Sequence, residues 1–117
     1  KGILGTSSFD APGTARAIDE LGLKGKVFTA GTGMPAANAQ ILKDGSVSTL
    51  TLWDPANAGY AMASLATKIL NGETIEDGVN LGVEGYESMH FSSGSTKVLE
   101  GTGWLKITKD NVDSLGF

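Results

Sequence analysis

The 117-residue sequence contains no cysteine and only one histidine. Without cysteine, a disulfide framework, a thiolate metal site and a cysteine nucleophile are excluded. The single histidine, His90, lies in a serine-rich stretch with no acid pair nearby in the sequence, which favours a structural or surface role. No common motif of hydrolases, zinc proteases or phosphate-binding loops occurs. The sequence therefore predicts a binding protein that is not an enzyme and that needs no cofactor or metal.

Positive charge is also scarce, since nine Lys and Arg stand against 13 Asp and Glu, for a net charge of −4. This balance provides no basic stripe for phosphates, so binding to nucleic acid or to an anionic membrane is disfavoured. We expect a small, neutral or weakly polar partner. No run is apolar enough to span a bilayer, and we expect no signal peptide within these residues. The abrupt start at Lys1-Gly2 suggests a piece cut from a longer protein.

The three prolines occupy equivalent places. Each follows a short apolar or β-branched run by a few residues and opens a helical pattern. The sequence thus predicts three consecutive strand-helix units, in residues 2–23, 26–45 and 47–72. Such units belong to the α/β class and form a parallel, Rossmann-like sheet with right-handed crossovers.

The third unit has the clearest pattern. Residues 47–52 form a β-branched and apolar run, and Trp53-Asp54-Pro55 then ends the strand and opens a helix that Gly72 stops. In open α/β sheets, ligands bind beyond the carboxyl ends of the strands. Trp53 and Asp54 therefore fall where ligand contacts are expected.

After Gly72 the pattern changes. Residues 73–85 form a connection rich in glycine and acid, and residues 89–92 and 95–99 are expected as short strands joined by a turn at Ser93-Gly94. A further strand is expected within residues 101–108, before a final short segment at 112–117.

One candidate site is the run Gly31-Thr32-Gly33-Met34-Pro35-Ala36. It matches the glycine pattern of dinucleotide-binding proteins, follows a strand and opens a helix, and Asp54 ends the next strand near the expected place of a ribose-binding acid. Against this interpretation, Pro35 removes an amide close to the pyrophosphate, and the unit is the second rather than the first.

The other candidate site is a ring of polar and aromatic residues at the ends of the three strands. Carboxylates and amides bind adjacent sugar hydroxyls, and an aromatic face covers the apolar C–H surface. The ring comprises Ser7, Ser8, Asp10, Thr32, Trp53, Asp54 and Asn57.

Each of these residues also has a purely structural interpretation. Asp10 and Asp54 can cap the helices that follow them. Trp53 can fill the core, and Ser7 and Ser8 can satisfy loop amides. Sequence alone leaves both interpretations open.

Three stretches together resemble the C-terminal third of type 1 periplasmic sugar-binding proteins, and most closely the rhamnose-binding and autoinducer-binding branch of ABC-transporter receptors. They are SSFDAPGTARAIDELGLKGKV, GTGMPAANAQILKDGSV and LWDPANAGYAMASLATKILNGE, and Lys109-Asp110-Asn111 before Phe117 is similar to the end of that branch. The resemblance covers essentially the whole chain. It implies a fragment of a two-lobed receptor that acts outside the cytoplasm, in the periplasm or as a cell-surface lipoprotein, and delivers a sugar or sugar-like ligand to an ABC permease.

The resemblance also implies a division of the chain. Residues 1–54 would be the βαβαβ part of the C-terminal lobe, residues 55–80 a helix and connection belonging to the other lobe, and residues 81–117 the last strands and tail. It assigns ligand contacts to Ser7, Ser8 and Asp54, with Pro12 and Thr14 added in the autoinducer branch. Thr32-Gly33 stands where ribose-type receptors carry a carboxylate, which favours the rhamnose and autoinducer branch.

Three further expectations follow. A fragment would expose sheet edges and the apolar face of the helix after Pro55, so the chain either compacts on itself or pairs with a second copy. Sugar affinity of the fragment alone is expected to be weak or absent.

The alternatives to the sugar-receptor interpretation are an oxidoreductase fragment that binds a nucleotide cofactor such as NAD at residues 31–36, and a sugar-responsive transcriptional regulator of the same fold.

Overall fold

The computed structural model describes all 117 residues and divides into two compact units. Unit 1 comprises residues 1–52 and 105–117, and unit 2 comprises residues 53–104. The chain therefore passes from one unit to the other twice, after Leu52 and after Trp104.

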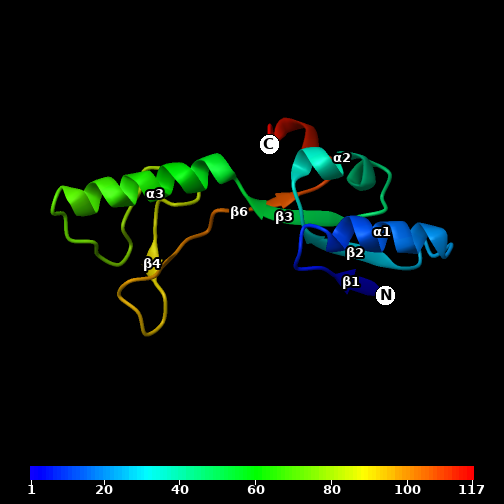
Figure 1. Cartoon of the computed structure of the whole chain (residues 1–117), viewed down its shortest axis with the longest axis horizontal. Coiled ribbons are helices and arrows are strands. Elements are labelled where there is room, and N and C mark those ends of the chain that lie inside the picture. The colour runs from blue at the N-terminus through cyan, green and yellow to red at the C-terminus, as the bar shows by residue number, and fades with distance from the viewer. The chain divides into compact units, whose positions relative to one another are not determined.

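Unit 1 is built on a four-stranded sheet in the order β1-β2-β3-β6, with β1 at Gly2–Leu4, β2 at Phe28–Thr32, β3 at Thr49–Trp53 and β6 at Trp104–Ile107. The strands β1, β2 and β3 are parallel, which confirms the predicted sheet of three consecutive strand-helix units. Figure 1 shows β6 beside β3. The Thr49 hydroxyl at the start of β3 donates to the Ile107 carbonyl oxygen at the end of β6, at 2.9 Å. Because the start of one strand meets the end of the other, β6 runs antiparallel to β3.

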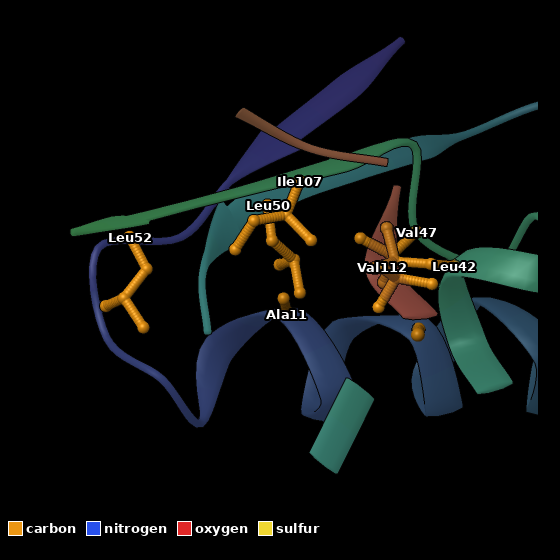
Figure 2. Packing of buried hydrophobic residues seen from close by; sticks show 8 residues of the cluster. Ala11, Leu42, Val47, Leu50, Leu52, Ile107 and Val112 are labelled. Atoms are coloured by element: carbon orange, nitrogen blue, oxygen red, sulfur yellow. The ribbon is translucent and has the colours of Figure 1, made fainter. Parts of the chain in front are cut away.

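Both helices of unit 1 cover the same face of this sheet. The helix α1 spans Asp10–Glu20 and α2 spans Pro35–Lys43. Successive right-handed crossovers that step in one direction across a sheet place their helices on one side. Figure 2 shows the consequence, because the side chains of Leu50 and Ile107 point from the strands toward Ala11 on α1. These three residues are fully buried.

The core also includes the C-terminal segment. A short 3-10 helix at Val112–Ser114 places Val112 beside Leu42 and Val47, and Phe117 packs against the same cluster. The tail therefore belongs to the core of unit 1 and packs against α2.

The strand β2 begins two residues later than its predicted start at Lys26. The backbone N–H groups of Lys26 and Val27 both donate to the Leu23 carbonyl oxygen, at 2.9 and 3.1 Å. A turn therefore uses these amides before the strand can, and Gly25 supplies its positive φ of 79°.

Unit 2 is organised by α3, which spans Pro55–Leu70. Its start at Pro55 agrees with the sequence prediction, and Gly72 follows its end with a φ of 78°. Ala61 on this helix packs with Leu81 and Met89 in a second, smaller core. No helix of the chain has both the length and the apolar character needed to cross a membrane.

The predicted strands after α3 are present but short. The strands β4 at His90–Phe91 and β5 at Leu99–Glu100 pair antiparallel. The predicted turn at Ser93-Gly94 is closed by a hydrogen bond from the Ser95 N–H to the Ser92 carbonyl oxygen, at 2.9 Å. The strand expected at 95–99 is confined to its last residue and Glu100, since residues 95–98 belong to the loop.

The predicted division into lobes at residues 54 and 80 stays a prediction, because the compact units reflect packing within this chain alone. Their boundaries lie after Leu52 and after Trp104, so residues 81–117 are shared between the two units. The reason is packing, because Leu105 and Ile107 join the core of unit 1 whereas Leu81 and Met89 form that of unit 2.

Candidate ligand-binding site

The first loop, between β1 and α1, is held by the Asp10 carboxylate. Its Oδ2 accepts hydrogen bonds from the backbone N–H groups of Thr6 and Ser7, both at 2.9 Å. The capping interpretation of Asp10 is therefore wrong. The helix begins at Asp10 itself, and its N-cap residue Phe9 has no side-chain capping bond. The carboxylate instead closes the loop that precedes the helix.

Two polar groups of this loop remain free of protein partners. The Ser7 hydroxyl oxygen accepts from the Phe9 N–H at 3.3 Å, as the loop-amide interpretation predicts. The Ser8 hydroxyl and Asp10 Oδ1 take part in no hydrogen bond within the chain. Beside the loop lies an open depression of about 360 Å³, lined by Ile3, Leu4, Gly5, Phe9, Asp10, Gly13 and Thr14. Among the predicted residues, Asp10 and Thr14 therefore line a pocket.

Close packing accounts for the glycines of the second loop, between β2 and α2. A Cβ atom on Gly31 would lie 2.9 Å from the Gly5 carbonyl oxygen, and one on Gly33 would lie 3.0 Å from Asn38 Nδ2. The Ala36 N–H, at the start of α2, donates to the Phe117 carbonyl oxygen at 3.2 Å. The glycine pattern and one helix-terminal amide thus have roles within the protein. Thr32, which ends β2, is half-buried.

Asp54 caps α3 with only one of its two carboxylate oxygens. Its Oδ1 accepts from the N–H groups of Ala56 and Asn57, at 2.7 and 3.2 Å, which confirms the capping interpretation. Its Oδ2 has no hydrogen-bond partner in the chain, and neither has the side-chain amide of Asn57. Capping therefore leaves an acceptor and an amide available at the end of β3.

Trp53 lies next to Trp104 rather than in a core. The two rings are perpendicular, with centroids 5.4 Å apart and an interplanar angle of 86°. Trp53 is 43% exposed and Trp104 58% exposed. Sequence reasoning missed Trp104, because only the pairing of β3 with β6 brings it to Trp53.

Sequence reasoning also missed the partners of His90. Its Nδ1 lies 3.0 Å from Asp77 Oδ2, and its Nε2 lies 3.1 Å from the Ser88 hydroxyl. Asp77 Oδ1 accepts from the Phe91 N–H at 2.7 Å. The hydrogen bond with His90, followed by that from Phe91, lowers the pKa of Asp77 below 3.8.

The hydrogen-bonded arrangement of Ser88, His90 and Asp77 resembles a hydrolytic triad, but its surroundings do not suit catalysis. The side chains of His90 and Asp77 are 61% and 60% exposed. None of the three residues lines any of the described pockets. Without a site that excludes water, such a network acts as a surface link between the loop at Asp77 and β4.

The predicted site residues divide between the two units. Unit 1 carries Ser7, Ser8, Asp10, Pro12, Thr14 and Thr32, and unit 2 carries Trp53, Asp54 and Asn57. No group of His, Asp and Glu side chains has the arrangement of a metal site. The chemistry of both sets is that of hydrogen bonding and aromatic contact, as expected for a solute-binding domain.

The family comparison agrees with this class. Residues 1–74 match the family described as "Periplasmic binding protein domain". The chain belongs to this family, whose members bind solutes. A search of the curated proteins found no match.

Two solved structures are similar over the full length of the chain. One is described as a sugar ABC transporter from Actinomyces odontolyticus ATCC 17982, with a TM-score of 0.78, 28% identity and 37% of its chain covered. The other is LsrB from Clostridium saccharobutylicum in complex with AI-2, with a TM-score of 0.68, 23% identity and 40% of its chain covered. The second shows similarity of fold alone. The chain thus spans well under half the length of these proteins.

The cap at Asp54 gives a first prediction. Asp54→Ala removes the acceptor of two helix-terminal N–H groups and should lower the free energy of unfolding by about 0.5–2 kcal/mol. Asp54→Ser keeps a capping oxygen, so its loss in free energy of unfolding should be only a few tenths of that expected for Asp54→Ala. Urea unfolding followed by circular dichroism measures both. Equal losses in the two variants would contradict the capping role.

The Asp77 network predicts a pH dependence. The pKa of Asp77 is lower in the folded chain than its unfolded value of 3.8, so its stabilisation is present above that pH. It is lost as the pH falls through the folded value. Asp77→Asn should therefore weaken the fall in stability below pH 3.8, and His90→Gln should do the same by removing the first donor. Unfolding curves across acid pH test this, and an unchanged acid sensitivity in Asp77→Asn would refute it.

Proposed function

We propose that the chain is part of a two-lobed receptor outside the cytoplasm that binds a sugar or sugar-like solute for an ABC importer. One observation carries this proposal. In a member of the periplasmic binding protein family, the carboxylate of Asp54, the residue after β3, keeps one oxygen free after capping α3. The similar structure with 28% identity is described as a sugar ABC transporter.

The free polar groups suit a polyhydroxylated ligand. Asp54 Oδ2 and Asp10 Oδ1 are acceptors for hydroxyl hydrogens, and the Ser8 hydroxyl and the Asn57 amide can both donate and accept. Ser7 and Thr32 contribute short polar side chains at the other strand ends. The assignment of Pro12 and Thr14 rests on the family resemblance, and Thr14 also lines the depression beside the first loop.

The signal would be conformational. A ligand that fits the closed receptor better than the open one shifts the population toward closure, and an ABC permease would recognise that state. The receptor would act in the periplasm or as a lipoprotein at the cell surface. We assign no catalytic activity to the chain.

Each alternative predicts a feature that distinguishes it from the proposed receptor. An oxidoreductase would bind a dinucleotide at residues 31–36, where Gly31, Gly33 and Ala36 already have packing roles or partners within the chain. A transcriptional regulator would share the sugar site but would carry a DNA-binding segment.

A thermal-shift screen of the complete receptor that contains this chain tests the proposal. The probes are L-rhamnose, D-ribose, a furanose signal molecule and NAD. We expect a sugar or the furanose to raise the melting temperature and NAD to leave it unchanged. Asp54→Ser, which keeps the helix cap, should weaken binding by about 1.5–3 kcal/mol if the carboxylate accepts ligand hydroxyls. Stabilisation by NAD alone would defeat the proposal.

We further propose that the 117-residue chain, studied alone, pairs with a second copy. Large apolar side chains remain exposed on α3, including Met62 and Leu70, and Leu4 and Phe28 are exposed in β1 and β2. Isolated surfaces of this kind favour association. Size-exclusion chromatography with light scattering should give the mass of a dimer. A monomer with a cooperative melt would show that the chain needs no partner.

A further inference from the structure

Unit 2 contains an apolar groove that the proposed sugar site does not use. The groove consists of two open depressions, of about 320 and 280 Å³, which share Leu65, Lys97 and Leu99 in their linings. Apart from Lys97, Tyr86 and Thr96, every residue that lines it is apolar. The whole lining falls between residues 58 and 99, so the groove lies within a single packed unit.

The groove is elongated because α3 forms one of its walls. This wall consists of residues three or four positions apart on the helix: Ala58, Ala61, Leu65 and Ile69. An α-helix rises about 16 Å over that stretch. The short strands β4 and β5 contribute Phe91 and Leu99, which are paired in register. Such a groove suits an extended chain better than a compact ring.

Lys97 gives the groove an unpaired positive charge. Unit 2 contains one other lysine, Lys68, and no arginine, and Lys68 Nζ lies 3.1 Å from Glu73 Oε2. Lys97 forms no ion pair. Its backbone N–H donates to the Ser95 hydroxyl oxygen at 3.1 Å, which helps to hold the loop that carries it. No Asp or Glu lines either depression, so the lining has a net positive charge in an acidic chain.

The neutral polar groups of the lining are also free. The hydroxyls of Tyr86, in the first depression, and Thr96, in the second, take part in no hydrogen bond within the chain. Each can donate to an anionic oxygen. A sugar would leave most of its hydroxyls against apolar walls, which is unfavourable.

We propose that this groove binds the anion of a free medium-chain fatty acid, with the alkyl chain along α3 and the carboxylate beside Lys97. The apolar walls remove the chain from water, and the unpaired ammonium group complements a single negative charge. A groove of this volume accepts one alkyl chain, which favours the free acid over a lipid with two chains. This second ligand is independent of the proposed sugar.

The test uses the complete receptor that contains this chain, titrated in a calorimeter with octanoate, butanoate and 1-octanol. Octanoate should bind most tightly. Butanoate should bind about tenfold more weakly or worse, because it buries fewer methylene groups. Octanol, which has the same chain without the charge, should bind about twofold to fivefold more weakly than octanoate.

Two variants address the two parts of the groove. Lys97→Gln should weaken octanoate about twofold to fivefold and leave octanol unchanged. Its matched control is Lys106→Gln, at an exposed lysine of unit 1 that lines neither depression. Ala58→Leu fills part of the first depression and should weaken octanoate and octanol alike. Its matched control is Ala63→Leu, at an exposed position of α3 outside the lining.

Each contrary result overturns the proposal. If the complete receptor binds no octanoate, the groove is covered there by the rest of the receptor or by a second copy. If Lys97→Gln and Lys106→Gln bind octanoate equally well, Lys97 does not hold the carboxylate. If Ala58→Leu fails to fold, the decision rests on Lys97→Gln, which changes only an exposed side chain.

Discussion

The alternation of side chains along β3 is the constraint on which the rest of the structure depends. Leu50 and Leu52 point into the core beneath the sheet, where Leu50 meets Ile107 and Ala11. Shifting the strand by one residue would expose these leucines and bury the residues between them. The same register holds Trp53 away from the core and places Asp54 at the start of α3. The register of β3 therefore fixes both the packing of the core and the position of the candidate ligand groups.

Asp10 and Asp54 each combine a structural role with a second carboxylate oxygen that the proposed function assigns to a ligand. Each uses one oxygen for two backbone N–H groups and leaves the other without a protein partner. Binding those N–H groups fixes the orientation of the carboxylate, so little entropy is lost when a ligand hydroxyl reaches the free oxygen. The structural and functional interpretations of these two residues do not exclude each other. Asp10 achieves this by closing its loop, because the helix begins earlier than Pro12 suggests.

Features determined by neighbouring residues were predictable. The start of α3 at Pro55, its cap at Asp54 and its end near Gly72 depend on local backbone preferences, and the sequence prediction placed them correctly. The starts of α1 and β2 were displaced by two residues, since loop hydrogen bonds at Asp10 and Leu23 compete with strand and cap patterns. Such competition involves bonds of nearly equal strength, and composition alone does not decide it.

The sequence by itself determined the α/β class, the three strand-helix units, the parallel pairing of β1, β2 and β3, and the polar character of their carboxyl ends. These follow from apolar periodicity, proline placement and helix caps, all of which act over a few residues. Only the tertiary structure decided that β6 joins β3, that Trp104 meets Trp53, that Asp77 binds His90 and that Phe117 binds Ala36. Each of these contacts joins residues distant in the chain, and its energy depends on the whole core that brings them together.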